Sequence, residues 1–191
     1  DRPPKVLLVA SAMAAEGKTS LAVSIARLAA VSAMDGRVML IDGDLRRPAV
    51  APEMGLKAVK GLIHYFSGQA PLEDIIVEDP LTGVHAILAA PGTPNPPELL
   101  NSTHMRALLD KLSRTYDTIV IDSPALSEVS DALVLAHLAD ATIYVVQWET
   151  TLRHIAIESF KHLLAASAQI AGVVLQKVNT RKSASYGYEE S

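Results

Sequence analysis

A short segment near the start of the chain has the residue types and spacing of a phosphate-binding loop. Residues 11–20 read Ser-Ala-Met-Ala-Ala-Glu-Gly-Lys-Thr-Ser, and the end of this run fits the pattern G-x-x-x-x-G-K-[ST]. In such a loop, backbone N–H groups and the N-terminus of the next helix bind phosphate oxygens. Lys18 would reach the β- and γ-phosphates of ATP, and the Thr19 hydroxyl would bind Mg²⁺. The predicted nucleotide-binding residues are Met13, Ala14, Ala15, Glu16, Gly17, Lys18, Thr19 and Ser20.

The loop is unusually rich in alanine. Ala12 stands where the pattern has its first glycine, and Ala14 and Ala15 stand where glycine or proline is frequent. If one of these positions has a left-handed backbone, alanine costs about 1–2 kcal/mol there, which would weaken nucleotide binding without abolishing it. The alternative is a chance Gly-Lys-Thr at the start of a helix. The apolar run before the loop, the helical pattern after it and two further acidic strand ends argue against chance.

Three aspartates lie at the ends of two other apolar runs. Asp42 ends the first run and Asp44 follows two residues later, whereas Asp122 ends the second. Ligands of an open α/β sheet bind beyond the carboxyl ends of the strands, so we expect all three carboxylates to converge with Lys18. One carboxylate can hold Mg²⁺ directly or through water, and another can accept a proton from an attacking hydroxyl. The alternative is that each aspartate only caps a turn.

Strand and helix patterns alternate along the chain and would position these residues. The expected strands are residues 5–10, 37–42, 84–88, 118–122, 142–146 and 172–175. The expected helices are residues 18–33, 61–66, 98–114, 130–137 and 151–166. The first strand, loop, helix and second strand form a right-handed βαβ unit. The alternation predicts an α/β fold with a doubly wound, mostly parallel sheet flanked by helices.

One domain and a tail account for the length. The 191 residues suit a single α/β domain with its own core, which we place at residues 1–180. Residues 181–191 lack any apolar period and are expected to form a flexible tail that contains Tyr186 and Tyr188.

Composition excludes several other classes of protein. The net charge of −4 is spread without long blocks of one sign, which argues against nucleic acid as a partner. The chain has no cysteine, so disulfides and thiolate metal sites are excluded, and its six histidines lack the spacing of zinc ligands. No apolar run reaches the length of a membrane-spanning helix. The start Asp-Arg-Pro-Pro has no initiator methionine, and we expect a piece of a longer chain whose other parts could contain membrane segments.

These motifs together resemble the bacterial tyrosine kinases, the cytoplasmic domains of polysaccharide co-polymerases, which share the P-loop fold of the deviant-Walker ATPases. That family has a Walker A loop, then D-x-D-x-R after an apolar strand, then a Walker B strand ending in D-[ST]-P. Here the second motif is Asp42-Gly-Asp44-Leu-Arg46, and Walker B ends in Asp122-Ser-Pro124. The Pro-rich loop at 92–102 is also similar, and the resemblance covers nearly the whole chain.

The resemblance implies a role for each matched residue. Lys18 would contact phosphate, and Thr19, Asp44 and Asp122 would organise Mg²⁺. Asp42 would be the base for a tyrosine hydroxyl. The phosphoacceptors implied are Tyr186 and Tyr188 of the tail.

The resemblance also implies an ATP-dependent protein tyrosine autokinase that regulates exopolysaccharide polymerisation and export. Its partners would be neighbouring subunits of a homo-oligomeric ring, together with an upstream transmembrane co-polymerase region or activator. The chain would then be a cytoplasmic domain attached to the inner membrane through residues outside this sequence. Family members usually read Pro-Gly-Glu-Gly-Lys where this chain reads Ala-Ala-Glu-Gly-Lys at 14–18.

Two other functions remain open from the sequence. One is a nucleotide-binding regulatory module of a co-polymerase with little or no kinase activity, which the altered loop would explain. The other is an ATPase of the chromosome-partitioning or septum-placing kind. Those ATPases have a signature lysine early in the loop, where this chain has Met13, and the Asp42-Gly-Asp44 motif favours the kinase family.

Overall fold

The computed structural model describes residues 3–32, 36–57, 59–90, 102–127 and 131–183. Its strands are β1 (Val6–Ser11), β2 (Val38–Asp42), β3 (Ile76–Glu78), β4 (His85–Ile87), β5 (Thr118–Asp122), β6 (Ala141–Gln147) and β7 (Ile170–Gln176). Its helices are α1 (Lys18–Ser32), α2 (Val50–Met54), α3 (Leu62–Phe66), α4 (Ser102–Leu112), α5 (Asp131–Leu138), α6 (Arg153–Ala165) and α7 (Thr180–Ser183), with a 3-10 turn at Leu72–Asp74.

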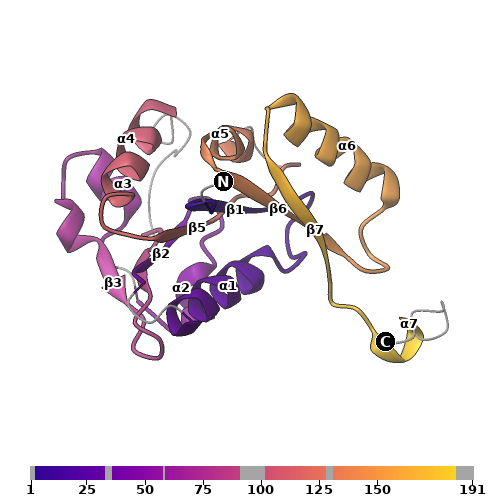
Figure 1. The fold of residues 1–191 in the computed structure, drawn as a ribbon, viewed down its shortest axis with the longest axis horizontal. Helices are drawn as coiled ribbons and strands as arrows, with labels where there is room; N and C mark the ends of the chain where they lie inside the picture. Colours follow the sequence, from indigo (N-terminus) through magenta and orange to yellow (C-terminus); the bar gives the residue numbers. More distant parts are fainter. Residues whose placement is uncertain (1–2, 33–35, 58, 91–101, 128–130, 184–191) are drawn as a thin grey trace.

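The strands form one sheet in the order β3-β4-β2-β5-β1-β6-β7. Every neighbouring pair is parallel except β3 with β4. Figure 1 shows α1 and α2 on one face of this sheet and α3, α4, α5 and α6 on the other. The predicted doubly wound, mostly parallel sheet is therefore confirmed.

Alternating side chains along the central strands build a core on each face of the sheet. Leu8, Ile41 and Ile121 belong to the core under α3 to α6. Val9, Leu40 and Val120 belong to the core under α1 and α2. These six side chains are all fully buried, because strands covered by helices on both faces have no solvent side.

The order of the strands brings three connections to one edge of the sheet. β5 lies between β1 and β2, and Asp122 at the end of β5 is in register with Asp42 of β2 and with Val9 of β1. The loop that leaves β1, the Asp42–Asp44 turn and the end of β5 therefore meet.

Helix α1, which begins at Lys18, is held against the sheet along its length. Ala22, Val23 and Ala26 are buried on its inner face. Beyond them, Arg27 donates two hydrogen bonds to Asp79, from Nε at 2.9 Å and Nη2 at 3.3 Å. Burial would raise the pKa of Asp79, but the hydrogen bonds from Arg27 and Thr82 hold it below its usual 3.8. The hydrogen bonds between Arg27 and Asp79 therefore restrain the C-terminal half of α1, the helix that begins at Lys18.

Some elements differ from the sequence prediction. β3 is only three residues long and pairs antiparallel at the edge of the sheet, too short to give a periodic signal. The tail, expected to be flexible from residue 181, begins in the short helix α7. Asn179 caps this helix, because its Oδ1 accepts hydrogen bonds from the N–H groups of Arg181 and Lys182.

No helix in the described ranges combines the length and the apolar character that crossing a bilayer requires.

Candidate nucleotide site

The phosphate loop connects β1 to α1 and has two residues with a left-handed backbone. Gly17 has φ +96° and Ala15 has φ 64°. Glycine adopts this conformation freely, whereas an alanine costs about 1–2 kcal/mol there. The cost expected from the alanine-rich sequence thus falls on Ala15.

Side chains from outside and inside the loop hold it in this conformation. Glu16 is buried, and its Oε2 accepts a hydrogen bond from the N–H of Met13 at 2.7 Å. Its Oε1 accepts a hydrogen bond from the hydroxyl of Thr151, which lies just before α6. The ammonium of Lys177 donates to the carbonyl oxygen of Ala15 at 2.6 Å. The strained loop is therefore tied to the segments that follow β6 and β7.

Lys18 lies between two of the predicted carboxylates. Its Nζ is 3.7 Å from Asp44 Oδ2 and 3.8 Å from Asp122 Oδ1. The Thr19 hydroxyl donates to Asp122 Oδ2 at 2.6 Å. All three charged side chains are nearly inaccessible to solvent. The sequence prediction that these groups converge is confirmed.

Asp42 belongs to the same cluster but lies deeper in the protein. Its side chain is fully buried, and its two oxygens accept hydrogen bonds from the N–H groups of Asp44 at 3.2 Å and Val50 at 3.3 Å. Burial, and next the charge of Asp122, raise its pKa from 3.8 to about 7. In this conformation Asp42 holds the turn that presents Asp44.

A cavity of about 420 Å³ opens over the loop. Of the predicted nucleotide-binding residues, those that line it are Ala14, Ala15, Gly17, Lys18, Thr19 and Ser20. Asp44, Arg47, Ala49 and Lys177 complete the lining. Met13 and Glu16 do not line it. A larger hollow of about 820 Å³ lies at the opposite edge of the sheet, near Lys5 and Asp140, and contains none of the predicted site residues.

Thr19 and Asp44 line this cavity, and together with Asp122, which accepts the hydrogen bond of Thr19, they fit a magnesium ion brought by a nucleotide. Asp122 Oδ1 is a buried carboxylate oxygen without a hydrogen-bond partner among the described residues, so it has a free acceptor directed at the cluster. Within the described ranges, no group of three or more His, Asp or Glu side chains could hold a metal ion. Mg²⁺ in nucleotide sites needs only one or two carboxylates, because phosphates and water supply the other ligands. Asp122, Asp44 and the Thr19 hydroxyl match that requirement.

Gly43 sets the distance between the two acidic strand ends. Its N–H donates to the carbonyl oxygen of Asp122 at 2.8 Å. A Cβ added at Gly43 would lie 2.8 Å from that same oxygen and 3.1 Å from Leu135 Cδ1. A side chain at this position would therefore push β2 away from β5.

We expect Gly43→Ala to lower the free energy of unfolding by about 1–3 kcal/mol, because overpacking against backbone atoms forces the strands to shift. Urea unfolding followed by circular dichroism measures this change. Gly172→Ala is the matched control, since a Cβ there meets no atom within 4 Å. Equal stability of the two variants would contradict the close approach.

Two residues of the site were missed by the sequence analysis. Thr151 and Lys177 are 135 and 162 positions from their loop partners, and no local pattern links residues so far apart. Arg47, three residues after Asp44, also lines the cavity. The predicted phosphoacceptors Tyr186 and Tyr188 and residues 92–101 of the Pro-rich loop lie outside the described residues.

The fold and this site define a P-loop nucleotide-binding domain. A phosphate loop joins a central parallel strand to a helix, and acidic residues end the two neighbouring strands. The septum site-determining protein MinD of Pyrococcus horikoshii, solved with Mg-ADP, has the same fold, with a TM-score of 0.74 over 92% of this chain and 71% of that chain at 22% sequence identity.

Closer relatives identify the family. No profile of a known protein family matches the chain. The tyrosine-protein kinase YwqD of Bacillus subtilis (strain 168) is 30% identical over 189 residues, which cover 98% of this chain and 78% of YwqD. The tyrosine-protein kinase Etk of Escherichia coli (strain K12) is 30% identical over 96% of this chain. The solved kinase domain of VpsO superposes with a TM-score of 0.85 at 32% identity, covering 92% of this chain and 86% of that chain.

The chain belongs to the bacterial tyrosine-protein kinases. It spans most of YwqD but only 25% of the length of Etk.

Proposed function

We propose that the chain is an ATP-dependent tyrosine autokinase that phosphorylates Tyr186 and Tyr188 of its own C-terminal tail, in trans between neighbouring subunits. One observation carries the proposal. The Lys18 ammonium lies within 4 Å of the carboxylates of Asp44 and Asp122 at the mouth of a phosphate loop. Tyrosine is proposed as the phosphate acceptor because the chain belongs to a family of tyrosine-protein kinases.

Each residue of the cluster has a role in this proposal. Loop N–H groups and Lys18 bind the β- and γ-phosphates of ATP and stabilise the charge that develops on them. Thr19, Asp44 and Asp122 hold Mg²⁺, which supplies charge neutralisation on the phosphate oxygens when bound. The tyrosine oxygen forms a bond to the γ-phosphorus while the bond from that phosphorus to the β–γ bridging oxygen breaks. ADP leaves, and the tyrosine proton passes to a carboxylate.

Asp42 is our proposed acceptor of that proton. Its pKa, raised to about 7, suits a general base at neutral pH. Its side chain is fully buried and holds the turn through hydrogen bonds from the Asp44 and Val50 N–H groups, so a tyrosine hydroxyl can reach it only if this turn opens. The proposal therefore includes a movement of this turn when the substrate tyrosine binds.

The wider setting follows from the family resemblance. We propose that the kinase acts as a cytoplasmic domain, in a ring of identical subunits, and that phosphorylation regulates exopolysaccharide polymerisation and export. Attachment to the inner membrane would come from a transmembrane co-polymerase region or activator outside this sequence.

Mass spectrometry tests the activity directly. The purified protein, extended by its native flanks and incubated with Mg-ATP, is expected to gain phosphate on Tyr186 and Tyr188. The matched control is the double variant Tyr186→Phe, Tyr188→Phe, which keeps the nucleotide site and should lose the signal. Bound ATP without phosphotyrosine would favour the regulatory module, and release of inorganic phosphate alone would favour a partitioning-type ATPase.

A further inference from the structure

Two of the left-handed residues other than glycine, Ala15 and Lys177, meet at the phosphate loop. Among the described residues, four have this backbone: Ala15, Glu149, Ser167 and Lys177. Glu149 follows β6 and Lys177 follows β7, and these two strands are neighbours. The N–H of Trp148 joins the two segments by donating to the carbonyl of Gln176 at 3.0 Å. Strained residues persist where surrounding contacts determine them, and they cluster at binding sites.

Lys177 is the residue of this group that reaches the loop. Its ammonium donates to the Ala15 carbonyl at 2.6 Å and lies 3.5 Å from Gln147 Oε1. Both partners are neutral oxygens, and Lys177 forms no ion pair within the described part of the chain. Lys18, in contrast, faces two carboxylates. Lys177 thus adds an uncompensated positive charge to the lining of the cavity over the loop.

The hydrogen bond to Ala15 also fixes a donor of the loop. The carbonyl of Ala15 and the N–H of Glu16 belong to one planar trans peptide, so they point in opposite directions. The hydrogen bond from Lys177 to the Ala15 carbonyl therefore also fixes the direction of the Glu16 N–H, which belongs to the phosphate loop. The side chain of Gln176 adds to this contact, because a Cβ at Gly17 would lie 3.5 Å from its Cγ.

We propose that Lys177 is a positioning residue of the nucleotide site. It holds the phosphate loop in the conformation that binds phosphate, and it links nucleotide binding to α7, the helix in which the C-terminal tail begins. This inference rests on the proposed function, because it needs the loop to bind a nucleotide.

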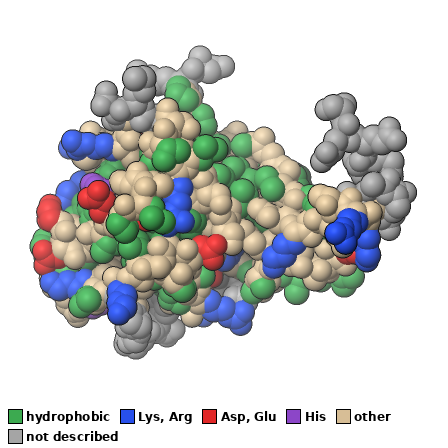
Figure 2. Space-filling model, turned by 90° about the horizontal axis from the view of Figure 1, so that it is seen from below, with side chains coloured by type: hydrophobic (Ala, Val, Ile, Leu, Met, Phe, Trp, Pro, Cys, Tyr) green, Lys and Arg blue, Asp and Glu red, His purple; other side chains and the backbone are tan. Residues whose placement is uncertain are grey.

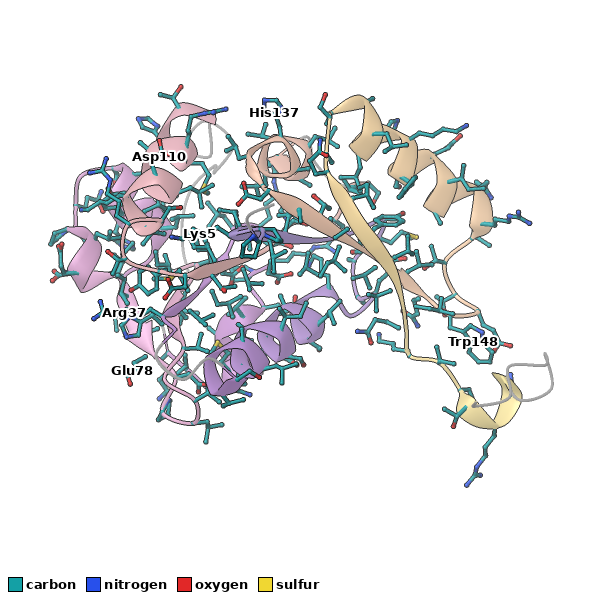
Figure 3. The ribbon with its side chains drawn as sticks, viewed as in Figure 1. Lys5, Arg37, Glu78, Asp110, His137 and Trp148 are labelled. Carbon is teal, nitrogen blue, oxygen red and sulfur yellow. The ribbon has the colours of Figure 1, made fainter. Side chains whose placement is uncertain are left out.

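The link to the tail follows from the chain itself. Only Val178 and Asn179 separate Lys177 from α7, and Lys182 of α7 pairs with Glu149 at 3.2 Å. Figure 2 shows Lys and Arg side chains gathered at the end of the molecule that carries α7, and Figure 3 shows Trp148 between the sheet and this helix. A nucleotide that fixes the loop is expected to slow the opening of residues 176–183.

Equilibrium binding of a fluorescent ADP tests the positioning role. We expect Lys177→Met to weaken binding about fivefold, since a hydrogen bond from a charged donor to an exposed carbonyl has a modest net effect. Lys177→Arg is expected to bind within about twofold of the wild type. Arg181→Met is the matched control, because it removes one positive charge from the same segment at an exposed side chain, and it should bind like the wild type.

Amide hydrogen exchange gives a second readout that does not depend on kinase activity. ADP should slow exchange in the loop and in residues 176–183 of the wild type, but only in the loop of Lys177→Met. If Lys177→Met bound ADP and exchanged its amides like the wild type, the inference would be overturned and the proposed function would stand. An equal loss of ADP binding in Arg181→Met would also overturn it. Failure of the wild type to bind any adenine nucleotide would overturn the proposed function and this inference with it.

Discussion

Lys18→Met is expected to lower the rate of tyrosine phosphorylation by about a hundredfold to a thousandfold. Methionine keeps the length of the side chain but removes the charge that stabilises the transferred phosphoryl group. The ammonium is nearly buried between Asp44 and Asp122, so solvent cannot replace it. Incorporation of labelled phosphate, resolved by time, measures the rate.

The same variant separates catalysis from the role of acceptor. Lys18→Met keeps its tail and should be phosphorylated on Tyr186 and Tyr188 by a protein that lacks residues 181–191. That truncated protein keeps the nucleotide site but has no tail tyrosine. Phosphate on the variant alone would establish transfer in trans. A variant that retains wild-type autophosphorylation would contradict the role of Lys18 in the transfer.

Lys18→Met also leaves two carboxylates close together without their cation. Removing one partner of a buried ion pair is costly, about 3–5 kcal/mol in fully buried cases, so the midpoint of urea unfolding should fall as well. Lys18→Arg, which keeps the charge, is the control for stability. Activity measured below the unfolding transition distinguishes a folded, inactive variant from an unfolded one.

The sequence predicted most of the architecture and the centre of the site for a common physical reason. Parallel strands buried on both faces give continuous apolar runs, and their carboxyl ends meet at one edge. Asp42, Asp44 and Asp122 could therefore be placed beside Lys18 without any knowledge of strand order. The site lies where β1, β2 and β5 end, and β5 indeed runs between the other two.

The outer contacts of the loop could not be predicted in this way. The left-handed backbone of Ala15 could not be predicted, because alanine, unlike glycine, is not typical of this conformation. Its partner Lys177 lies near the other end of the sequence. The depth of Asp42 was missed for a related reason. Alternation along a strand places Asp42 and Asp44 on one side, but the chain turns at Gly43 and directs the Asp42 oxygens to backbone N–H groups instead.

Asp122→Asn is expected to reduce phosphorylation by about a hundredfold or more. The amide can still accept the Thr19 hydrogen bond on one atom, but its NH₂ group then faces the Lys18 ammonium, where the carboxylate oxygen now lies 3.8 Å away. A neutral amide is also a weaker ligand for Mg²⁺. The Mg²⁺ concentration that gives half-maximal activity should therefore rise, while Mg²⁺-free binding of ADP should change little.

Asp122→Asn is expected to raise the free energy of unfolding at neutral pH, although it lowers the kinase activity. Burial raises the pKa of Asp122 from 3.8 to about 6, although Lys18 and Thr19 oppose the shift. The folded state thus binds a proton more tightly than the unfolded chain, and stability is lost as pH rises from about 3.8 to 6. In Mg²⁺-free buffer, Asp122→Asn should flatten this part of the curve of stability against pH.

Asp110→Asn, on the exposed side of α4 (Figure 3), is the control that should leave both the activity and this curve unchanged. An unaltered Mg²⁺ requirement in Asp122→Asn would remove Asp122 from the proposed metal ligands.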